Sequence, residues 1–148
     1  MRLLLSILFL WGGVFAGNTQ EPVQWRYALA QTGPKTFEVK AIATLEKGWH
    51  IYSQTTPEGG PVPTQFQFNK NPVLVFKGTV QESGKKIKKY EEVFDVTTES
   101  YDHKVEFVQT IQLKASAKTS ISGTVTYMVC SEEQCLPPTT KPFRLTIQ

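Results

Sequence analysis

Cys130 and Cys135 are the only two cysteines of the chain, and the tetrapeptide Ser-Glu-Glu-Gln separates them. A pair this close can form a disulfide across the end of a β-hairpin. The bond can also reopen, because a thiolate that attacks one sulfur forms a mixed disulfide that the neighbouring thiol then resolves. The first question is therefore whether this pair is a structural cross-link or a centre for thiol–disulfide exchange.

The surroundings of the two cysteines leave both answers open. Glu132 and Glu133 place two carboxylates between them, which disfavours the thiolate form that exchange requires. Most disulfides of exported domains are structural, so composition alone favours a structural cross-link and leaves exchange as the alternative. The two cysteines could also bind zinc with His50 and His103, but their spacing matches no zinc-finger pattern. We therefore expect neither a metal nor a cofactor.

The start of the chain predicts export. Arg2 precedes an apolar run that reaches Trp11, and Ala16 supplies a small residue at a suitable cleavage point. This pattern is typical of a secretory signal peptide, here residues 1–17, with cleavage near Ala16 or Gly17. The run is shorter than the roughly 20 residues of a transmembrane helix. We therefore expect residues 18–148 to form one exported domain with no membrane span after cleavage, in a compartment where disulfides persist.

The charge of the chain excludes little and indicates no polyanionic partner. The formal net charge is +3, and one of the positive charges, Arg2, belongs to the predicted signal peptide. A mildly basic domain gives no reason to expect a nucleic-acid partner. The basic run Lys85–Lys89 is interpreted as a solvated turn or sheet edge that discourages aggregation, with a docking patch for an acidic partner as the alternative.

The elements that must position the cysteines are β-strands. Short runs of β-branched and aromatic residues alternate with polar ones and are separated by Gly, Pro, Asn and Ser, and no stretch has a sustained helical period. Seven or eight such strands predict an all-β, immunoglobulin-like antiparallel β-sandwich. The Pro- and Gly-rich segment Ser53–Thr64 is interpreted as a surface loop, or alternatively as a wall at one end of the sandwich. The predicted strands are Gln24–Ala30, Thr36–Thr44, Trp49–Tyr52, Gln65–Phe68, Val73–Val80, Lys104–Leu113, Gly123–Cys130 and Phe143–Ile147.

Three segments resemble one known family. Tyr127–Lys141 contains an aromatic strand, a cysteine, a short polar loop, a second cysteine, two prolines and a Thr-Lys pair. This order resembles the redox motif of the amino-terminal domain of DsbD. Glu91–Asp95 with the following Tyr101–Val105 resembles the family's cap loop and next strand, and Gly48–Tyr52 resembles the aromatic strand beside the cysteines. The family's fold is an immunoglobulin-like sandwich, which agrees with the strand pattern.

The resemblance implies a role for each matching residue. Cys135 would form mixed disulfides with partners, and Cys130 would resolve them. Phe94 would be the cap, an aromatic lid over the disulfide that moves aside when a partner docks. The flanking residues of the site follow from the same match. His50 and Tyr52 stand where the family has tyrosines beside the cysteines, Glu92 stands where it has an acidic residue beside the cap, and Tyr127 lies in the strand that leads to Cys130.

The resemblance also implies a function and partners. It indicates a periplasmic thiol:disulfide interchange protein that relays electrons from a membrane reductase to periplasmic disulfide isomerases or cytochrome c maturation thioredoxins. Family members continue into membrane and thioredoxin domains, whereas this sequence ends at Gln148. We therefore expect a separate membrane electron carrier as donor, thioredoxin-like proteins as acceptors, and one component of a reductase system rather than a stand-alone enzyme. The alternative is a non-catalytic immunoglobulin-like binding or chaperone module with a structural hairpin disulfide.

Overall fold

The computed structural model describes residues 21–148, which form β-strands and connecting segments without a helix. The predicted signal peptide, residues 1–17, lies outside the described residues. Within residues 21–148, no helix has the length and apolar character needed to cross a membrane. The strands are β1 (Val23–Gly33), β2 (Thr36–Leu45), β3 (His50–Tyr52), β4 (Gln65–Phe68), β5 (Leu74–Glu91), β6 (Val96–Leu113), β7 (Thr119–Tyr127), β8 (Val129–Cys130) and β9 (Thr139–Ile147).

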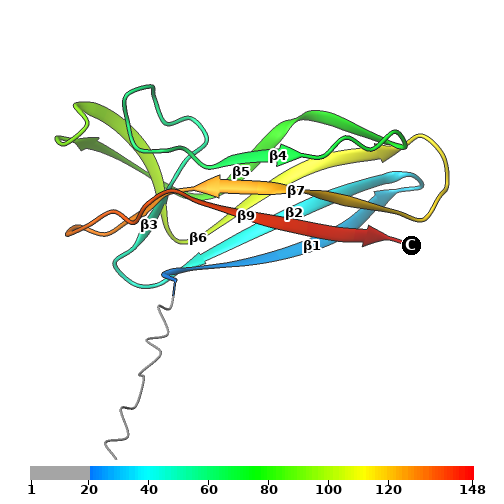
Figure 1. Cartoon of the computed structure of the whole chain (residues 1–148), viewed down its shortest axis with the longest axis horizontal. Helices are drawn as coiled ribbons and strands as arrows, with labels where there is room; N and C mark the ends of the chain where they lie inside the picture. The colour runs from blue at the N-terminus through cyan, green and yellow to red at the C-terminus, as the bar shows by residue number, and fades with distance from the viewer. Residues whose placement is uncertain (1–20) are drawn as a thin grey trace, which may run out of the picture.

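The strands form two antiparallel sheets (Figure 1). The larger sheet has the order β1-β2-β6-β3-β8, with β5 paired to β6, and the smaller sheet has the order β4-β7-β9. Alternate residues of each strand face the core, as in β2, where Phe37, Val39, Ala41 and Ala43 are buried and the residues between them are not. The predicted all-β, immunoglobulin-like antiparallel sandwich is confirmed.

Aromatic residues fill the space between the sheets near the cysteine end. Trp25 from β1 is partly buried, with its ring centroid 5.3 Å from that of Tyr127 in β7 and 5.9 Å from that of Phe107 in β6. Tyr101 is fully buried in the same cluster. These contacts join the two sheets, and they place Trp25 and Tyr101 in the core or at its rim, as their aromatic character predicts.

Strands β5 and β6 are much longer than predicted and form one hairpin that turns between Glu91 and Val96. The prediction missed the second half of β5 because nearly all of its residues are exposed and polar, so they show no alternation of apolar residues. Within residues 21–148, β5 pairs only with β6. The Lys85–Lys89 run therefore lies on a sheet edge and not in a turn, and its lysines are exposed. The alternative of a docking patch for an acidic partner stays a prediction.

A bend divides this hairpin into two halves. Gly84 pairs with Val105, but the next pair is Lys86 with Tyr101, so three residues of β6 oppose one residue of β5. His103 lies in this bulge with a φ of 59°. Bulges of this kind bend the strand and redirect its side chains. The outer half of the hairpin, Lys86–Tyr101, curls away from the rest of the sheet at the end opposite the C-terminus (Figure 1).

The chain crosses from one sheet to the other just before Cys130. The sequence predicts one strand over Gly123–Cys130, but the structure divides it at Met128. Tyr127 pairs with Thr139 in the smaller sheet, whereas Val129 pairs with Ile51 in the larger sheet. The prediction missed the break because the period of two continues from Tyr127 to Val129. As a result, Cys130 lies at the seam between the two sheets.

Candidate functional site

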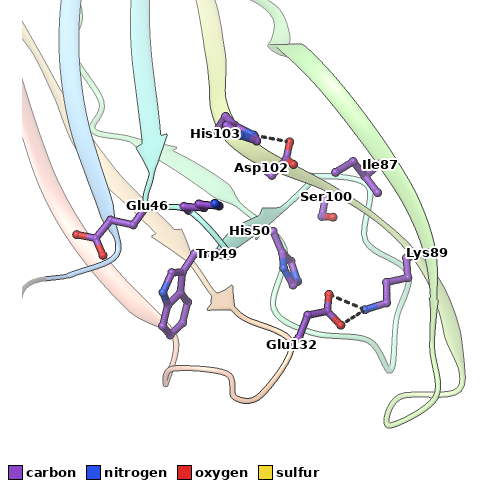
Figure 2. Close-up of a pocket in the computed structure, with 11 residues that line it drawn as sticks. Glu46, Trp49, His50, Ile87, Lys89, Ser100, Asp102, His103 and Glu132 are labelled. Atoms are coloured by element: carbon purple, nitrogen blue, oxygen red, sulfur yellow. Dashed lines mark hydrogen bonds and ion pairs between the residues drawn. The ribbon is translucent and has the colours of Figure 1, made fainter.

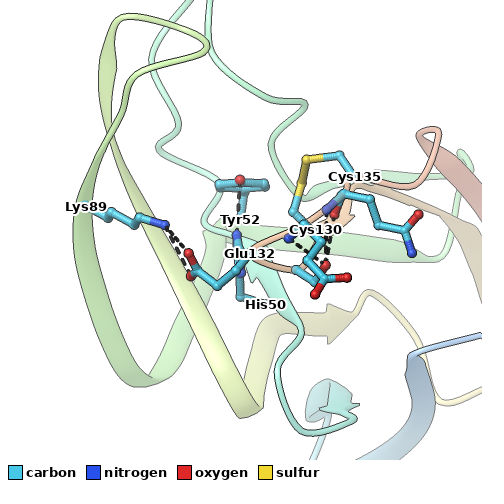
Figure 3. Close-up of a disulfide and its surroundings, with 9 residues drawn as sticks. His50, Tyr52, Lys89, Cys130, Glu132 and Cys135 are labelled. Atoms are coloured by element: carbon cyan, nitrogen blue, oxygen red, sulfur yellow. Dashed lines mark hydrogen bonds and ion pairs between the residues drawn. A yellow bond between two sulfur atoms is a disulfide. The ribbon is translucent and has the colours of Figure 1, made fainter.

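The two cysteines form a disulfide that closes a short hairpin end (Figure 3). Their Cα atoms are 4.0 Å apart. The Leu136 amide donates to the Val129 carbonyl (2.9 Å), and the Ser131 amide donates to the Gln134 carbonyl (2.8 Å). The Ser131 hydroxyl also accepts from the Glu133 and Gln134 amides, both at 3.2 Å. Backbone and side-chain hydrogen bonds therefore hold the cysteine loop, Ser131–Gln134, in addition to the disulfide.

The two cysteines differ sharply in exposure. Cys130 ends strand β8 and is only 1% exposed, whereas Cys135 follows the loop and is exposed. Attack on a disulfide requires access to one of its sulfur atoms. The structure therefore offers Cys135 to an incoming thiol and holds Cys130 behind it.

Strand register gathers the surroundings of Cys130 on one face. Cys130 pairs with His50, and His50 pairs with Asp102, so these side chains share a face of the larger sheet. The alternate residues Ile51 and Tyr101 point to the opposite face and are buried in the core. We call the face that carries Cys130, His50 and Asp102 the site face. Its members are Ile87 and Lys89 from β5, Thr98, Ser100 and Asp102 from β6, His50 and Tyr52 from β3, and Cys130 from β8.

His50 and Tyr52 contact each other on the site face beside the disulfide. The His50 Nε2 and Tyr52 hydroxyl are 3.1 Å apart, and the two rings pack edge to face with centroids 5.1 Å apart. Burial lowers the pKa of His50, so its neutral form is favoured. Burial, together with the nearby carboxylates of Glu91 and Glu132, raises the pKa of Tyr52 to about 12. The sequence-predicted pair is thus a neutral, hydrogen-bonded contact next to Cys130.

An ion pair connects the hairpin to the cysteine loop. The Lys89 Nζ lies 3.2 Å from each carboxylate oxygen of Glu132 (Figure 3). A groove runs beside this pair, between the hairpin, β3 and the loop (Figure 2). Trp49, His50, Asp102 and His103 also line it. Within residues 21–148, no group of three or more His, Cys, Asp or Glu side chains is arranged to hold a metal ion.

The structure brings together four of the predicted site residues, Cys130, Cys135, His50 and Tyr52. Phe94 is half-buried in the hairpin turn, where its amide donates to the Glu91 carbonyl at 3.1 Å. The remaining two residues lie elsewhere. The Glu92 side chain is exposed and forms no hydrogen bond or ion pair with another described residue, and Tyr127 is buried in the core against Trp25.

Sequence reasoning missed Lys89 and Asp102, which line the groove, and the pairing of Glu132. Lys89 and Glu132 are separated by 43 positions. The lysine run and the cysteine loop carry opposite charges in the sequence, but their contact depends on how β5, β6, β3 and β8 are arranged in the larger sheet. No local pattern in the sequence predicts that arrangement.

The family profile described as the N-terminal domain of the thiol:disulfide interchange protein DsbD matches residues 19–147. The fold is similar to the N-terminal periplasmic domain of ScsB from Proteus mirabilis, with a TM-score of 0.61, 17% identity, 85% of this chain covered and 47% of that chain covered. It is also similar to the reduced DsbD N-terminal domain from Neisseria meningitidis, with a TM-score of 0.54, 18% identity and coverages of 82% and 84%.

The chain spans about half the length of the ScsB structure that it matches, and most of the Neisseria domain. No curated protein matches the sequence significantly. The two structural likenesses agree on the fold, and the family profile covers the whole sandwich together with the cysteine motif. The chain belongs to the family of DsbD N-terminal domains.

Proposed function

We propose that this protein exchanges thiols and disulfides with partner proteins through Cys130 and Cys135. The observation that supports this most directly is the asymmetric disulfide, which joins an exposed Cys135 to a buried Cys130 at one end of the sandwich. Exchange needs one sulfur that a partner can reach and a second thiol that releases the partner. Membership of the DsbD N-terminal family supports the same role.

The exchange proceeds in two displacement steps. In the reduced protein, the Cys135 thiolate attacks the disulfide of an acceptor, and one acceptor sulfur leaves as a thiolate. Cys130 then loses its proton and attacks Cys135 Sγ, which breaks the mixed disulfide and forms the Cys130–Cys135 bond. Two electrons have passed to the acceptor, which leaves as a dithiol once its thiolates take up protons. A donor dithiol then reduces the Cys130–Cys135 bond by the same two displacement steps in reverse order and becomes a disulfide itself.

The proposed setting is the periplasm. The start of the chain has the pattern of a signal peptide, and the ScsB relative is described as a periplasmic domain. We propose thioredoxin-like proteins, such as periplasmic disulfide isomerases and cytochrome c maturation thioredoxins, as acceptors. A membrane reductase is the proposed electron donor.

The reduction potential of the Cys130–Cys135 bond tests the proposal. A redox carrier should have a potential well above about −300 mV, the limit below which structural disulfides typically lie. Equilibration with glutathione and dithiothreitol buffers, followed by thiol alkylation, measures it. A potential below that limit would instead support the alternative, an immunoglobulin-like binding module with a structural disulfide.

Single cysteine variants test the roles of the two sulfurs. Cys130→Ala should accumulate mixed disulfides with thioredoxin-like partners, because the resolving thiol is gone while the exposed Cys135 remains. Cys135→Ala should trap none, since Cys130 is buried. Non-reducing gels of the two variants, mixed with an oxidised thioredoxin-like protein, give the readout. Trapping by Cys135→Ala alone would reverse the assignment.

The proposed cap role of Phe94 needs its own test. Phe94 is half-buried in the hairpin turn, whereas its neighbour Val93 is 90% exposed. If the Phe94 ring shields the disulfide, Phe94→Ala should speed its reduction by small thiols. Val93→Ala is the matched control in the same turn and should leave the rate unchanged. Equal rates for the wild type and both variants would remove the cap assignment without affecting the proposed exchange chemistry.

A further inference from the structure

Four residues form a row across one end of the larger sheet, on the site face. In strand register, Asp102 of β6 lies opposite His50 of β3. His50 in turn lies opposite Cys130 of β8, and Cys130 lies opposite Cys135 (Figure 3). Residues directly opposite each other in an antiparallel pair project to the same face, with Cβ atoms about 4.5–5.5 Å apart. His50 is therefore the cross-strand neighbour of Cys130 on the side away from Cys135.

The imidazole of His50 is held in place and has one nitrogen available. Its ring packs edge to face against Tyr52, and Nε2 lies 3.1 Å from the Tyr52 hydroxyl. Within residues 21–148, Nδ1 forms no hydrogen bond or ion pair with another side chain. In the neutral tautomer whose Nε2–H donates to Tyr52, Nδ1 carries a lone pair that can accept a proton.

The buried thiol of reduced Cys130 needs such an acceptor. Cys130 is only 1% exposed, and burial disfavours the charged thiolate that attacks a disulfide. A base held beside the thiol can take its proton as the sulfur attacks. The other ionisable group in the row, Asp102, lies one strand farther away, and its carboxylate is 3.1 Å from Nδ1 of His103. His50 is therefore the base that the register places next to Cys130.

We propose that His50 is the general base that takes the proton of Cys130 as this residue attacks Cys135 Sγ in the mixed disulfide. The inference rests on the proposed thiol–disulfide exchange and names the acceptor of the proton that Cys130 loses. The Cys130 S–H bond breaks, the Cys130–Cys135 bond forms, and the partner sulfur leaves with the electron pair of the mixed disulfide. The imidazolium then gives its proton to that thiolate or to solvent. In the reverse direction, the imidazolium protonates Cys130 as it leaves.

The charges around His50 leave its imidazole neutral at neutral pH. Burial has the largest effect and lowers the pKa of His50 below about 6.5, although the three nearby carboxylates act in the opposite direction. The groups that face His50 are Lys89 and Glu91 from β5, Asp102 from β6, Glu132 from the cysteine loop and Tyr52 from β3.

A two-phase reaction isolates the step assigned to His50. The reduced protein is mixed with the aromatic disulfide dithiobis(nitrobenzoate), whose thiolate product is coloured. The exposed Cys135 attacks first and releases one thiolate, at a rate proportional to the reagent concentration. Cys130 then attacks Cys135 Sγ and releases the second thiolate, at a rate independent of that concentration. This second rate should be nearly constant from about pH 7 to about pH 8.5 and should fall at lower pH, because an imidazolium cannot accept a proton.

His50→Gln removes the base and keeps a hydrogen-bonding side chain opposite Cys130. Its second rate should be about 100-fold lower at neutral pH, the low end of what a positioned acid–base group contributes. The rate should then rise about tenfold per pH unit, since hydroxide replaces the imidazole. The first rate should not change. His103→Gln is the matched control, because the His103 side chain is 81% exposed in the same groove, and it should behave like the wild type.

Three outcomes would overturn the assignment of His50 and leave the proposed exchange intact. One is an unchanged second rate in His50→Gln. Another is a slower second rate with the wild-type pH profile, which a purely structural role would give. The third needs no substitution: a wild-type second rate that keeps rising about tenfold per pH unit between about pH 6 and about pH 8. Thermal unfolding checks that each variant is folded.

Failure of the proposed function would look different. Release of only one thiolate by the wild type would show that Cys130 does not resolve the mixed disulfide, and both proposals would then be rejected. A reduction potential in the range of structural disulfides, together with the expected pH profiles, would reject the role as an electron carrier but support His50 as the base.

Discussion

His50 occupies the position directly across from Cys130 and hydrogen-bonds to Tyr52 on the same face. The sequence resemblance placed both residues near the cysteines, and the strand register shows why they meet: β3 lies between β6 and β8, so alternate residues of β3 share the face of Cys130. Asp102 and Lys89 could not be predicted there in the same way. Their placement depends on which strands pair and where the hairpin bends, and neither is encoded locally.

The partial burial of His50 makes stability depend on pH. Burial lowers its pKa below the usual value of about 6.5, so the unfolded chain binds more protons than the folded one just below that pH. The free energy of unfolding should therefore fall as the pH drops from about 7.5 to about 5.5. Urea unfolding of the oxidised protein measures this loss, and His50→Gln should reduce it. His103→Gln is the control, since the His103 side chain is 81% exposed, and it should retain the loss.

At the scale of elements, the hairpin is fixed to the rest of the fold at its bend. Glu82 accepts hydrogen bonds from the Ser53 hydroxyl and the Gln54 amide (3.1 Å) and pairs with Lys86 at 3.0 Å. The Ser53–Thr64 segment contains no strand, and these hydrogen bonds tie its start to β5. Strands in which apolar and polar residues clearly alternate were predicted closely, and β4 has the predicted bounds. The polar outer half of β5 was not, because an exposed edge strand lacks that pattern.

Glu82→Gln should loosen this attachment. Burial on its own would raise the pKa of Glu82, but the hydrogen bonds from Ser53, Gln54 and Lys86 outweigh it and lower the pKa. The carboxylate therefore stabilises the fold above the carboxyl pKa of the unfolded chain, and this contribution is lost as the pH falls through the folded pKa. We expect Glu82→Gln to lower the free energy of unfolding by about 1.5–3 kcal/mol at neutral pH and by less in acid. Denaturant titrations at both pH values measure this, with the exposed Glu58→Gln as a control that should change little.

At the scale of the whole molecule, the disulfide lies at one end of the sandwich, and most of the core comes from other strands. Apart from Ile51 and Val129, the buried members of both core clusters belong to β1, β2, β5, β6, β7 and β9, and the cysteine loop has its own hydrogen bonds. The closed loop is short, so in the chain-entropy model the bond should stabilise the fold by somewhat less than the ~3 kcal/mol of a 15-residue loop. The reduced protein should therefore remain folded, with a free energy of unfolding lower by at most that amount.

This difference in stability constrains the potential. Reduction and unfolding form a thermodynamic cycle, so each ~1.4 kcal/mol that the bond adds to folding lowers its potential in the folded protein by ~30 mV relative to the unfolded chain. Urea unfolding of the oxidised protein and of the reduced protein in excess thiol gives the stability difference, and redox titration gives the potentials with and without denaturant. A small stability difference, matched by a small difference between the two potentials, would show that the fold leaves the bond close to its intrinsic potential, as a two-way carrier requires. A reduced protein that unfolds in water would contradict this, because the disulfide would then be a condition of folding rather than a reversible store of two electrons.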